Sequence, residues 1–324
     1  MKITTLHSTL DADALQTMVL TRYDLGETHW CKFWQRGLND TYLVETAAGK
    51  FVLRVYRAGW RTQEDIQYEI AMLDHLHQAG IGVAHALPAR SGQVLHPIES
   101  VEGERVAVLF SFAPGKPIPF DNTEQSERFG ALVARIHQTS DRFVSTNRRF
   151  ALDLNHLIYE PVAAILPHLE AEAERTLLQQ SADRLVARLN ALPLTALDYG
   201  FCHGDTHNWN AHVGEDGTIT MIDFDCSGPG WRAYDLGVFL WSAIWEKSKE
   251  VAWQPFLDGY TKERALNKTE QAAIPLFAWA RQFWYKGKRM ANNPVIWGYA
   301  WTDPQSELKF LQQLEESAGY DPNI

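Results

Sequence analysis

The chain has little cysteine, and no apolar run in it is long enough to cross a membrane. Its three cysteines, Cys31, Cys202 and Cys226, form no CxxC pair and follow no regular spacing. This argues against a disulfide framework and a structural zinc site, and it favours buried packing in a reducing cytoplasm. No eighteen apolar residues run together, and the first residues do not place a basic segment before an apolar one. We therefore expect neither a membrane span nor an export signal.

Basic residues are also scarce relative to acidic ones. The 324 residues include 30 Lys and Arg against 40 Asp and Glu, which gives a formal net charge of -10. Nucleic acids and anionic membranes reward clustered Lys and Arg, so we expect neither as a partner. Apolar residues make up 45% of the chain and charged residues 22%, which is ordinary for a protein with a sizeable core. The length fits one large domain or two lobes, and nothing in the sequence indicates the oligomeric state.

The most specific polar pattern lies in residues 202–237, which read CHGDTHNWNAHVGEDGTITMIDFDCSGPGWRAYDLG. Residues 211–213 and 218–224 are predicted strands joined by a tight Glu-Asp-Gly turn, so the segment folds back as a hairpin. Carboxylate and amide oxygens are the ligands that Mg²⁺ prefers when it also holds phosphates, and such a group could equally position a hydroxyl nucleophile. The hairpin brings four side chains of this kind together: Asp205, Asn210, Asp223 and Asp225.

The order and spacing of these residues match a known catalytic arrangement. A His-Gly-Asp triplet ends at Asp205, Asn210 follows after four residues, and Asp223 comes thirteen positions later behind an apolar pair. Protein kinases space the base and the metal ligands of phosphoryl transfer in this way, although Gly204 replaces their Arg and Asp225 replaces the Gly of their metal-binding triplet. The residues alone also allow a dinuclear metal hydrolase or a structural turn. A nucleotide-binding lobe upstream would favour the kinase.

This stretch resembles the aminoglycoside phosphotransferase and choline kinase family of protein-kinase-like enzymes, which includes homoserine kinases and carries HGDxHxxN followed by IDFxD. The catalytic residues that the resemblance implies are the base Asp205 with His203 and His207 in its loop, and the implied metal ligands are Asn210, Asp223 and Asp225. Asp225 would bind a second metal, contact the acceptor or only receive backbone N–H bonds. The resemblance also implies that Asp235 ties down the backbone of the catalytic loop.

An antiparallel meander precedes the catalytic stretch. Residues 29–36, 41–46 and 50–56 are alternating apolar runs that predict strands, and a turn at residues 47–49 joins the last two. The resemblance implies that the turn between the first two strands, residues 37–40, covers the phosphates of ATP. This turn contains only Gly37 and no GxGxxG motif. By its residues alone, Gly37 is equally well explained as part of an ordinary hairpin turn.

Arg54 lies in the third of these strands, FVLRVYR, where the family has the Lys that contacts the α- and β-phosphates. A buried, unpaired charge in a central strand costs several kcal/mol, so a phosphate or a carboxylate must accompany Arg54 unless the strand is a solvated edge. The resemblance implies Glu69 as this carboxylate, on a helix predicted for residues 63–79. Glu64 and Asp65 are rivals for the same role, although acidic residues are favoured in a first helical turn in any case.

A later strand, predicted for residues 105–112, ends in the chain breaker Ala-Pro-Gly. The resemblance makes this point the hinge between two lobes, beside the adenine of ATP. The implied adenine contacts are the backbone groups of Ser111, Phe112 and Ala113 and the side chains of Val52 and Leu109. We expect an N-terminal nucleotide-binding lobe over residues 1–113 and a catalytic and substrate-binding lobe over residues 114–324. The fold class is then α+β, a bilobal protein-kinase-like fold with a small antiparallel sheet lobe with one helix and a larger, mainly helical lobe.

The last eighty residues are rich in aromatic side chains, which either fill a helical core or line a pocket for a cationic substrate. These are Trp241, Trp245, Trp253, Phe277, Trp279, Phe283, Trp284, Tyr285, Trp297, Tyr299 and Trp301. The same region contains a basic cluster, Arg281, Lys286, Lys288 and Arg289. The cluster forms either a solvated face or a contact for an acidic substrate group, and the sequence leaves both questions open.

The resemblance implies ATP- and Mg²⁺-dependent transfer of the γ-phosphoryl group to an alcohol hydroxyl of a small molecule such as homoserine, choline, an amino sugar or an aminoglycoside. The acidic net charge slightly favours cationic acceptors. One alternative is a Ser/Thr protein kinase of the bacterial stress response type, because segments such as VLRVYRAGWRTQEDI resemble the stress response kinase A group. Few residues separate Asp223 from Tyr234, however, which leaves little platform for a peptide. A catalytically weak ATP-binding regulatory module is the alternative from another class.

Overall fold

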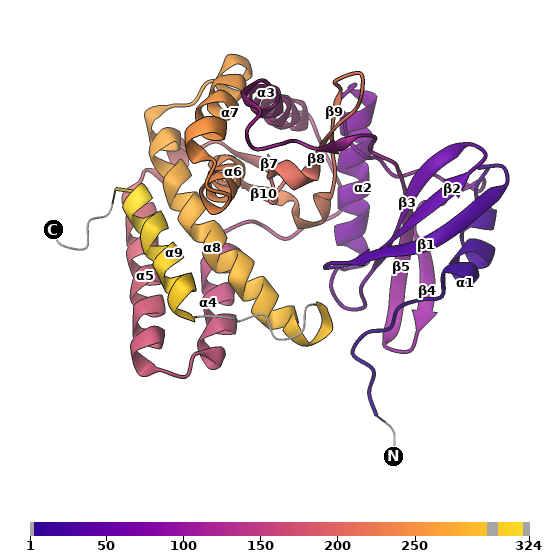
Figure 1. Ribbon diagram of the computed structural model, residues 1–324, viewed down its shortest axis with the longest axis horizontal. Coiled ribbons are helices and arrows are strands. Elements are labelled where there is room, and N and C mark those ends of the chain that lie inside the picture. The colour runs from indigo at the N-terminus through magenta and orange to yellow at the C-terminus, as the bar shows by residue number, and fades with distance from the viewer. Residues whose placement is uncertain (1–2, 297–303, 320–324) are drawn as a thin grey trace.

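The computed structural model describes residues 3–296 and 304–319 and arranges them in two lobes, a sheet lobe and a mainly helical lobe (Figure 1). This arrangement confirms the predicted α+β class. The sheet of the first lobe ends at Ser111, and the first long helix of the second lobe begins at Thr123. Three residues of the aromatic set, Trp297, Tyr299 and Trp301, lie outside the described residues.

The N-terminal lobe is built on a five-stranded antiparallel sheet in the order β1-β2-β3-β5-β4. Its strands are β1 (Thr28–Arg36), β2 (Asp40–Thr46), β3 (Gly49–Tyr56), β4 (His96–Ser100) and β5 (Gly103–Ser111). Because β3 pairs with β2 on one side and β5 on the other, it is a central strand, and its side chains alternate between two faces. Leu53 and Val55 belong to the outer apolar cluster, whereas Val52 packs against the inner one.

One helix covers each face of this sheet. α1 (Ala12–Met18) contributes Leu15 to the outer cluster, and α2 (Gln63–Gln78) lies on the inner side, between the sheet and the helical lobe (Figure 1). The helix predicted for residues 63–79 is therefore confirmed. α2 begins with a capping box in which Thr62 and Asp65 exchange hydrogen bonds. This cap uses the carboxylate of Asp65 and removes it as a rival of Glu69.

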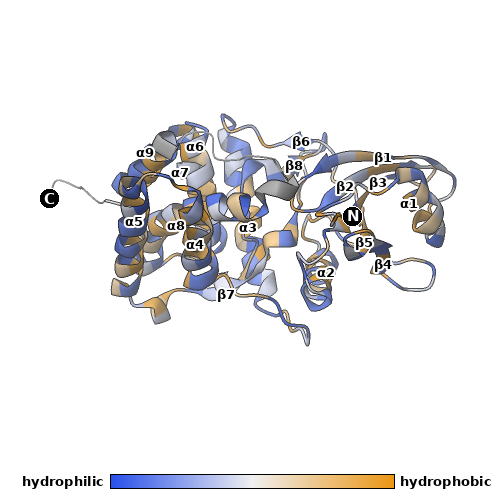
Figure 2. Cartoon of the chain, turned by 90° about the horizontal axis from the view of Figure 1, so that it is seen from below, coloured by the Kyte–Doolittle hydropathy of each residue, from blue (hydrophilic) through white to orange (hydrophobic). Residues whose placement is uncertain are grey.

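The second lobe contains the longer helices. The described ones are α3 (Thr123–Ser140), α4 (Glu160–Ile165), α5 (Glu172–Ala191), α6 (Ala233–Trp245), α7 (Lys249–Glu263), α8 (Lys268–Ile296) and α9 (Pro304–Ser317). Short 3-10 turns lie at Leu20–Arg22, Leu166–His168, Leu194–Ala196, Asn208–Asn210 and Phe224–Cys226, and Asn155–Tyr159 is a π-helical turn. Figure 2 shows mostly hydrophilic residues along α5, at the outer end of the lobe. Among the described helices, none is both long and apolar enough to traverse a bilayer.

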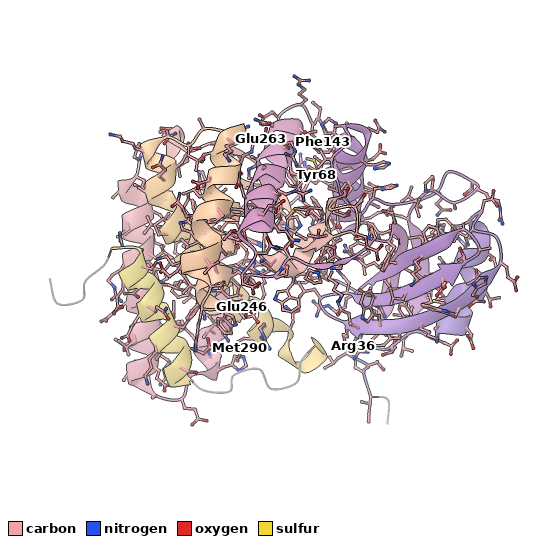
Figure 3. The ribbon with its side chains drawn as sticks, turned by 45° about the horizontal axis from the view of Figure 1, so that its top comes forward. Arg36, Tyr68, Phe143, Glu246, Glu263 and Met290 are labelled. Carbon is pink, nitrogen blue, oxygen red and sulfur yellow. The ribbon has the colours of Figure 1, made fainter. Side chains whose placement is uncertain are left out.

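Most of the described aromatic residues of this lobe are core residues. Phe239 of α6 and Phe256 of α7 stack with ring centroids 3.8 Å apart, and Phe277 and Trp279 of α8 are fully buried. The packing interpretation is thus confirmed for these positions. Between the lobes, Tyr68 of α2 meets the edge of Phe143 at a centroid distance of 5.4 Å (Figure 3).

Two small sheets support the catalytic stretch. β6 (Lys116–Pro117), β8 (Ala211–Val213) and β9 (Ile219–Met221) form one in the order β6-β8-β9, and β7 (Tyr199–Cys202) pairs with β10 (Gly228–Trp231) in the other. The predicted hairpin is present, but its second strand was expected to continue to residue 224 and ends at Met221. It ends there because Asp223 adopts the left-handed conformation, with φ 62° and ψ 61°, which an extended strand cannot contain.

Candidate active site

The loop after β7 carries Asp205 and is held from behind by Asp235. Asp235 lies in the first turn of α6, is fully buried, and accepts the backbone N–H groups of His203 and Gly204 at 2.7 Å each. Its Oδ2 also lies 3.0 Å from Nε2 of the buried His137 on α3. The expected role of Asp235 as the residue that ties down the catalytic loop is confirmed by these bonds.

The local backbone explains why glycine stands where protein kinases have Arg. Gly204 has a φ of +78°, in the left-handed region that glycine adopts freely. A Cβ at this position would lie 2.3 Å from the carbonyl oxygen of Cys226, in the turn that follows the metal-binding hairpin. Any side chain here would force these two segments apart.

His203 was assigned to the catalytic group, and the structure places it behind the catalytic carboxylate. Its Nδ1 accepts the backbone N–H of Asp205 at 3.1 Å, and its Nε2 lies 3.0 Å from the carbonyl oxygen of Ile222, to which it donates. Burial lowers the pKa of His203, which keeps the ring neutral and consistent with this pattern. Both ring nitrogens are therefore occupied, and His203 connects the catalytic loop to the end of β9.

Asp205 is an ionised carboxylate between three polar side chains. Asn210 Nδ2 donates to its Oδ2 at 3.0 Å, His207 Nε2 lies 3.4 Å from the same oxygen, and Arg281 of α8 donates to Oδ1. Burial alone would raise the pKa of Asp205, but His207 and Arg281 outweigh it and hold the pKa well below its usual range. Arg281 also donates to the carbonyl oxygen of Gly204 at 3.1 Å.

No local pattern in the sequence indicates that Arg281 reaches the loop that carries Asp205. It was noted only as part of a basic cluster, because a contact between residues 76 positions apart leaves no local pattern. Arg281 places a cation beside Asp205 from α8, a helix far away in the sequence.

Asn210 and Asp223 lie together at the end of the hairpin. The backbone N–H of Ile222 donates to the carbonyl oxygen of Asn210 at 2.9 Å, and Asn210 Nδ2 is directed to Asp205, which leaves its Oδ1 for a cation. The left-handed backbone of Asp223 turns its carboxylate outward, and that side chain is 50% exposed. Among the described residues no cluster of three acidic, His or Cys ligands forms. Two oxygen donors suit Mg²⁺, which takes its remaining ligands from water and phosphates.

Arg54 and Glu69 form the predicted ion pair between β3 and α2. Arg54 Nη1 lies 2.8 Å from Oε1 of Glu69, which is fully buried and also accepts the hydroxyl of Tyr56 at 3.1 Å. Arg54 Nη2 lies 3.0 Å from Oδ1 of Asp223, and the guanidinium stands 4.9 Å from the ring centre of Phe110. The position of Arg54 on a central strand removes the solvated-edge alternative.

Asp225 lines the cleft, but its carboxylate is bound by side chains from the segment that leads into α2. Its carboxylate accepts Nε1 of Trp60 at 2.8 Å and Nε of Arg61 at 3.1 Å, and only 2% of the residue is exposed. Burial would raise the pKa of Asp225, but Arg61 and Arg149 lower it. Both oxygens of the carboxylate are thus held by the segment that leads into α2. The structure favours a structural role for Asp225 over the expected second metal site.

The structure corrects one residue of the expected adenine site. Leu109 pairs with Leu53, and both are fully buried in the outer cluster beneath α1, so Leu109 faces away from the cleft. The neighbouring Phe110, which pairs with Val52, faces inward and is the residue beside Arg54. The strand at residues 105–112 was predicted correctly, but the face of β5 that meets the cleft was not.

The backbone groups of the remaining hinge residues, Ser111 to Ala113, differ in whether they already form hydrogen bonds within the protein. The backbone N–H of Ser111 donates to the carbonyl oxygen of His85 at 2.9 Å, so this group is already used within the lobe. The carbonyl oxygen of Ala113 lies 3.4 Å from Nδ1 of His212 in β8. Contact with adenine through Phe112 and Ala113 stays a prediction.

A cleft of about 220 Å³ between the first hairpin and α8 is lined by some of the assigned residues, but not by Asn210, Glu69 or the hinge residues. Gly37 lines it from the hairpin, where its N–H donates to the carbonyl oxygen of Asn39 at 3.0 Å. Arg54, Asp205 and Asp223 line its inner part. From α8 come Arg281, Trp284, Tyr285, Lys288 and Arg289. The cleft thus joins residues from the sheet lobe, the catalytic loop, the metal hairpin and α8.

Comparisons with known proteins agree with this geometry. Residues 29–271 match the sequence model of the phosphotransferase enzyme family. An uncharacterized protein of Deinococcus radiodurans is 37% identical over 97% of this chain and 93% of its own length. A homoserine kinase of Bradyrhizobium diazoefficiens is 26% identical over 91% and 89%. A solved structure of an amicoumacin kinase in complex with AMP-PNP, Ca²⁺ and Ami has the same fold, with a TM-score of 0.75, 23% identity and 93% of each chain covered.

Proposed function

The chain belongs to the phosphotransferase enzyme family, and on that premise we propose that it transfers the γ-phosphoryl group of ATP to the hydroxyl of a small molecule. The observation that carries this proposal is the convergence of Arg54, Asp205 and Asp223 at one cleft. These residues come from the sheet lobe, the catalytic loop and the hairpin, and each has the chemistry that phosphoryl transfer needs. The similar proteins named as kinases of homoserine and amicoumacin support an acceptor of this kind.

The sheet lobe would bind the nucleotide. Arg54 is the cation for the α- and β-phosphates, and its ion pair with Glu69 fixes the direction of the guanidinium. Val52 and Phe110 offer apolar surface on the same side of the sheet, next to the hinge. Gly37 lies above the phosphates as part of the first turn, where a hydrogen bond from Gly37 to Asn39 gives the turn its shape.

Asn210 and Asp223 would hold Mg²⁺, which neutralises phosphate charge when bound. Their amide and carboxylate oxygens are the hard donors that this ion accepts. In the structure Asp223 pairs with Arg54 at 3.0 Å. A phosphate group that binds Arg54 in place of Asp223 would leave the Asp223 carboxylate free to bind the cation. We therefore expect nucleotide and metal to bind together.

Asp205 would receive the acceptor. Its carboxylate accepts a hydrogen bond from the hydroxyl and takes the proton while the hydroxyl oxygen bonds to the γ-phosphorus. The bond from that phosphorus to the β,γ-bridging oxygen breaks, and ADP leaves with the electron pair. Arg281 holds Asp205 in its ionised form and fixes its orientation, and is therefore a positioning residue. Alignment and charge supply most of the rate enhancement in this reaction.

A small acceptor fits the chain better than a protein. After Asp223 the chain makes one 3-10 turn, Phe224–Cys226, and returns at once to β10 and the buried helix α6. In protein kinases the segment after the metal-binding Asp binds the substrate peptide. Here the corresponding residues, 224–245, are largely buried in the core. The presence of a base, a metal-binding carboxylate and a phosphate-binding cation at one cleft, in Asp205, Asp223 and Arg54, argues against a module that only binds ATP.

The test is transfer of label from γ-labelled ATP, with Mg²⁺, to a cell extract that is then fractionated by size. The Asp205→Asn variant serves as the control. Label in the small-molecule fraction is the expected result and yields the product for identification. Label in discrete proteins other than the enzyme itself would indicate a protein kinase, and no difference from the control would indicate a binding module.

A further inference from the structure

The α8 side of the cleft is cationic, although the protein as a whole is acidic. Arg281, Tyr285 and Lys288 follow one another at intervals of four and three residues, so they share one face of the helix. All three line the cleft, together with Trp284. A chain with a net charge of -10 thus presents positive charge at the place where an acceptor must enter.

The cations at the cleft, and Arg61 behind the cleft residue Asp225, differ in how they are paired. Arg54 has Glu69 at 2.8 Å, Arg61 has Asp225 at 3.1 Å, and Arg281 donates to Asp205. Each of these is a direct ion pair with a buried or half-buried carboxylate. These three guanidinium groups are neutralised within the protein.

Among the described residues, Lys288 has no carboxylate as close as these, and the neighbouring Arg289 donates to the hydroxyl of Tyr285 at 2.5 Å. The side chain of Lys288 is only 18% exposed, and its one ion-pair partner in this part of the chain is Glu160, whose Oε2 lies 3.7 Å from Nζ. That distance is too long for a hydrogen bond. Glu160 is itself 53% exposed, and its Oε1 already accepts Nδ2 of Asn155 at 2.8 Å. Burial lowers the pKa of Lys288, although the charge of Glu160 acts in the opposite direction.

In the function proposed above, Arg54 binds the phosphates of the nucleotide, and the acceptor approaches at Asp205, in line with the breaking bond. Lys288 lies two turns along α8 from Arg281, the partner of Asp205, or about 10 Å along the helix axis. Lys288 and Arg281 thus belong to the same wall of the cleft, whereas Arg54 belongs to the sheet lobe.

Resting on the function proposed above, we propose that the acceptor is a hydroxyl compound that also carries an acidic group, which binds at Lys288. The acidic group is a carboxylate or a phosphate ester, and the rings of Trp284 and Tyr285 flank the rest of the molecule. This reverses the preference for a cationic acceptor that the net charge suggested, because the local charge of α8 decides what the site binds. A charge-assisted hydrogen bond of this kind selects strongly against an uncharged analogue.

The first test separates candidate acceptors by charge. A small-molecule extract is passed over an anion exchanger at pH 11, where amines are neutral and carboxylates and phosphate esters remain charged. The retained and unretained fractions are assayed for label transfer with the wild-type protein and with Asp205→Asn. We expect transfer to the retained fraction, and transfer mainly to the unretained fraction would overturn the proposal. Transfer to neither fraction would count against the phosphotransferase function itself.

Treatment with a phosphatase distinguishes a carboxylate from a phosphate ester as the acidic group of the acceptor. The retained fraction is treated with alkaline phosphatase, which is then removed, before the assay. Loss of acceptor activity identifies a phosphate ester, and survival identifies a carboxylate. Both results support the inference, since the same ammonium group recognises either anion.

The second test removes the charge of Lys288. In Lys288→Gln the KM for the retained acceptor should rise about tenfold or more, while kcat and the KM for ATP stay within a few-fold of wild type. Lys288→Arg should restore part of the loss. The control is Lys262→Gln, because Lys262 is exposed on α7 and pairs with Glu127 outside the cleft. An unchanged acceptor KM in Lys288→Gln, or a rise confined to ATP, would overturn the assignment.

Discussion

The indole Nε1 of Trp60 donates to Oδ2 of Asp225 at 2.8 Å, which joins the segment before α2 to the turn after the metal-binding hairpin. Arg61 strengthens the junction, since its Nε also donates to the Asp225 carboxylate, at 3.1 Å. Arg149 spans the same two segments through the carbonyl oxygens of Asp65, at 2.6 Å, and Ser227, at 2.7 Å. Glu69 is carried by α2, so these bonds fix the distance between the Arg54–Glu69 pair and the catalytic hairpin.

Asp225→Asn should destabilise the protein without removing its metal site. The substitution leaves the buried Arg61 without its anionic partner, and breaking such a pair costs about 3–5 kcal/mol. We expect a lower urea midpoint and a lower turnover, while Mg²⁺-dependent nucleotide binding survives at temperatures where the variant is folded. Loss of that binding with unchanged stability would instead make Asp225 a metal ligand.

Asp205→Asn should separate chemistry from binding. The amide cannot take the acceptor proton, and loss of a positioned base typically costs a factor of about 10²–10⁴ in rate. ATP affinity should stay near the wild-type value, because Asp205 contacts no phosphate in the proposed arrangement. Single-turnover kinetics and calorimetry measure the two quantities. Asp216→Asn in the exposed hairpin turn is a control that should change neither, and full turnover in Asp205→Asn would contradict the assignment of the base.

Asp223→Ala should abolish the metal dependence of nucleotide binding. Its half-exposed carboxylate lines the cleft and is a hard oxygen donor of the kind that Mg²⁺ binds. Titration of ATP into the variant, with Mg²⁺ or with EDTA, should give the same weak affinity in both cases. In the wild type, EDTA should weaken binding markedly. A variant that still binds more tightly with Mg²⁺ than with EDTA would show that the metal is held elsewhere.

The stability of the protein should fall below pH 6.5 through His156. Its Nε2 accepts the indole N–H of Trp284 at 3.0 Å and must be unprotonated to do so. Burial, followed by the charge of Lys288, lowers the pKa of His156 to about 3. Between that value and its ordinary 6.5 the unfolded chain binds a proton that the folded chain does not, so acidification favours unfolding by about 1.4 kcal/mol per pH unit.

Urea unfolding at several pH values from 7.5 to 5 measures this effect. The unfolding free energy of the wild type should decline more steeply with falling pH than that of His156→Gln, which keeps a hydrogen-bond acceptor but cannot titrate. Some decline remains in the variant, because burial also lowers the pKa values of His137 and His203. Identical slopes for the two proteins would show that His156 is not the group responsible.

Local patterns were sufficient for the elements and for the chemistry of the catalytic stretch. The 3.6-residue stripe of α2 and the alternation of β3 were visible because neighbours on one face recur within a few residues. The spacing of Asp205, Asn210 and Asp223 was equally local, since one short hairpin brings all three together. A charge on a strand indicated that Arg54 needs an anionic partner, and the resemblance to the family pointed to Glu69 on α2 as that partner.

Only the tertiary structure decided which face of β5 meets the cleft and which partners the remaining charges take. Alternation places Leu109 and Phe110 on opposite faces, but the packing of α1 and α2 determines which face is which. Asp225 binds Trp60 at a separation of 165 residues, and Arg281 reaches Asp205 across 76. Contacts of this kind depend on how helices and sheets pack over the whole chain, which no local spacing records. The sequence therefore determined what chemistry the protein carries, and the packing determined which charges remain available to a substrate.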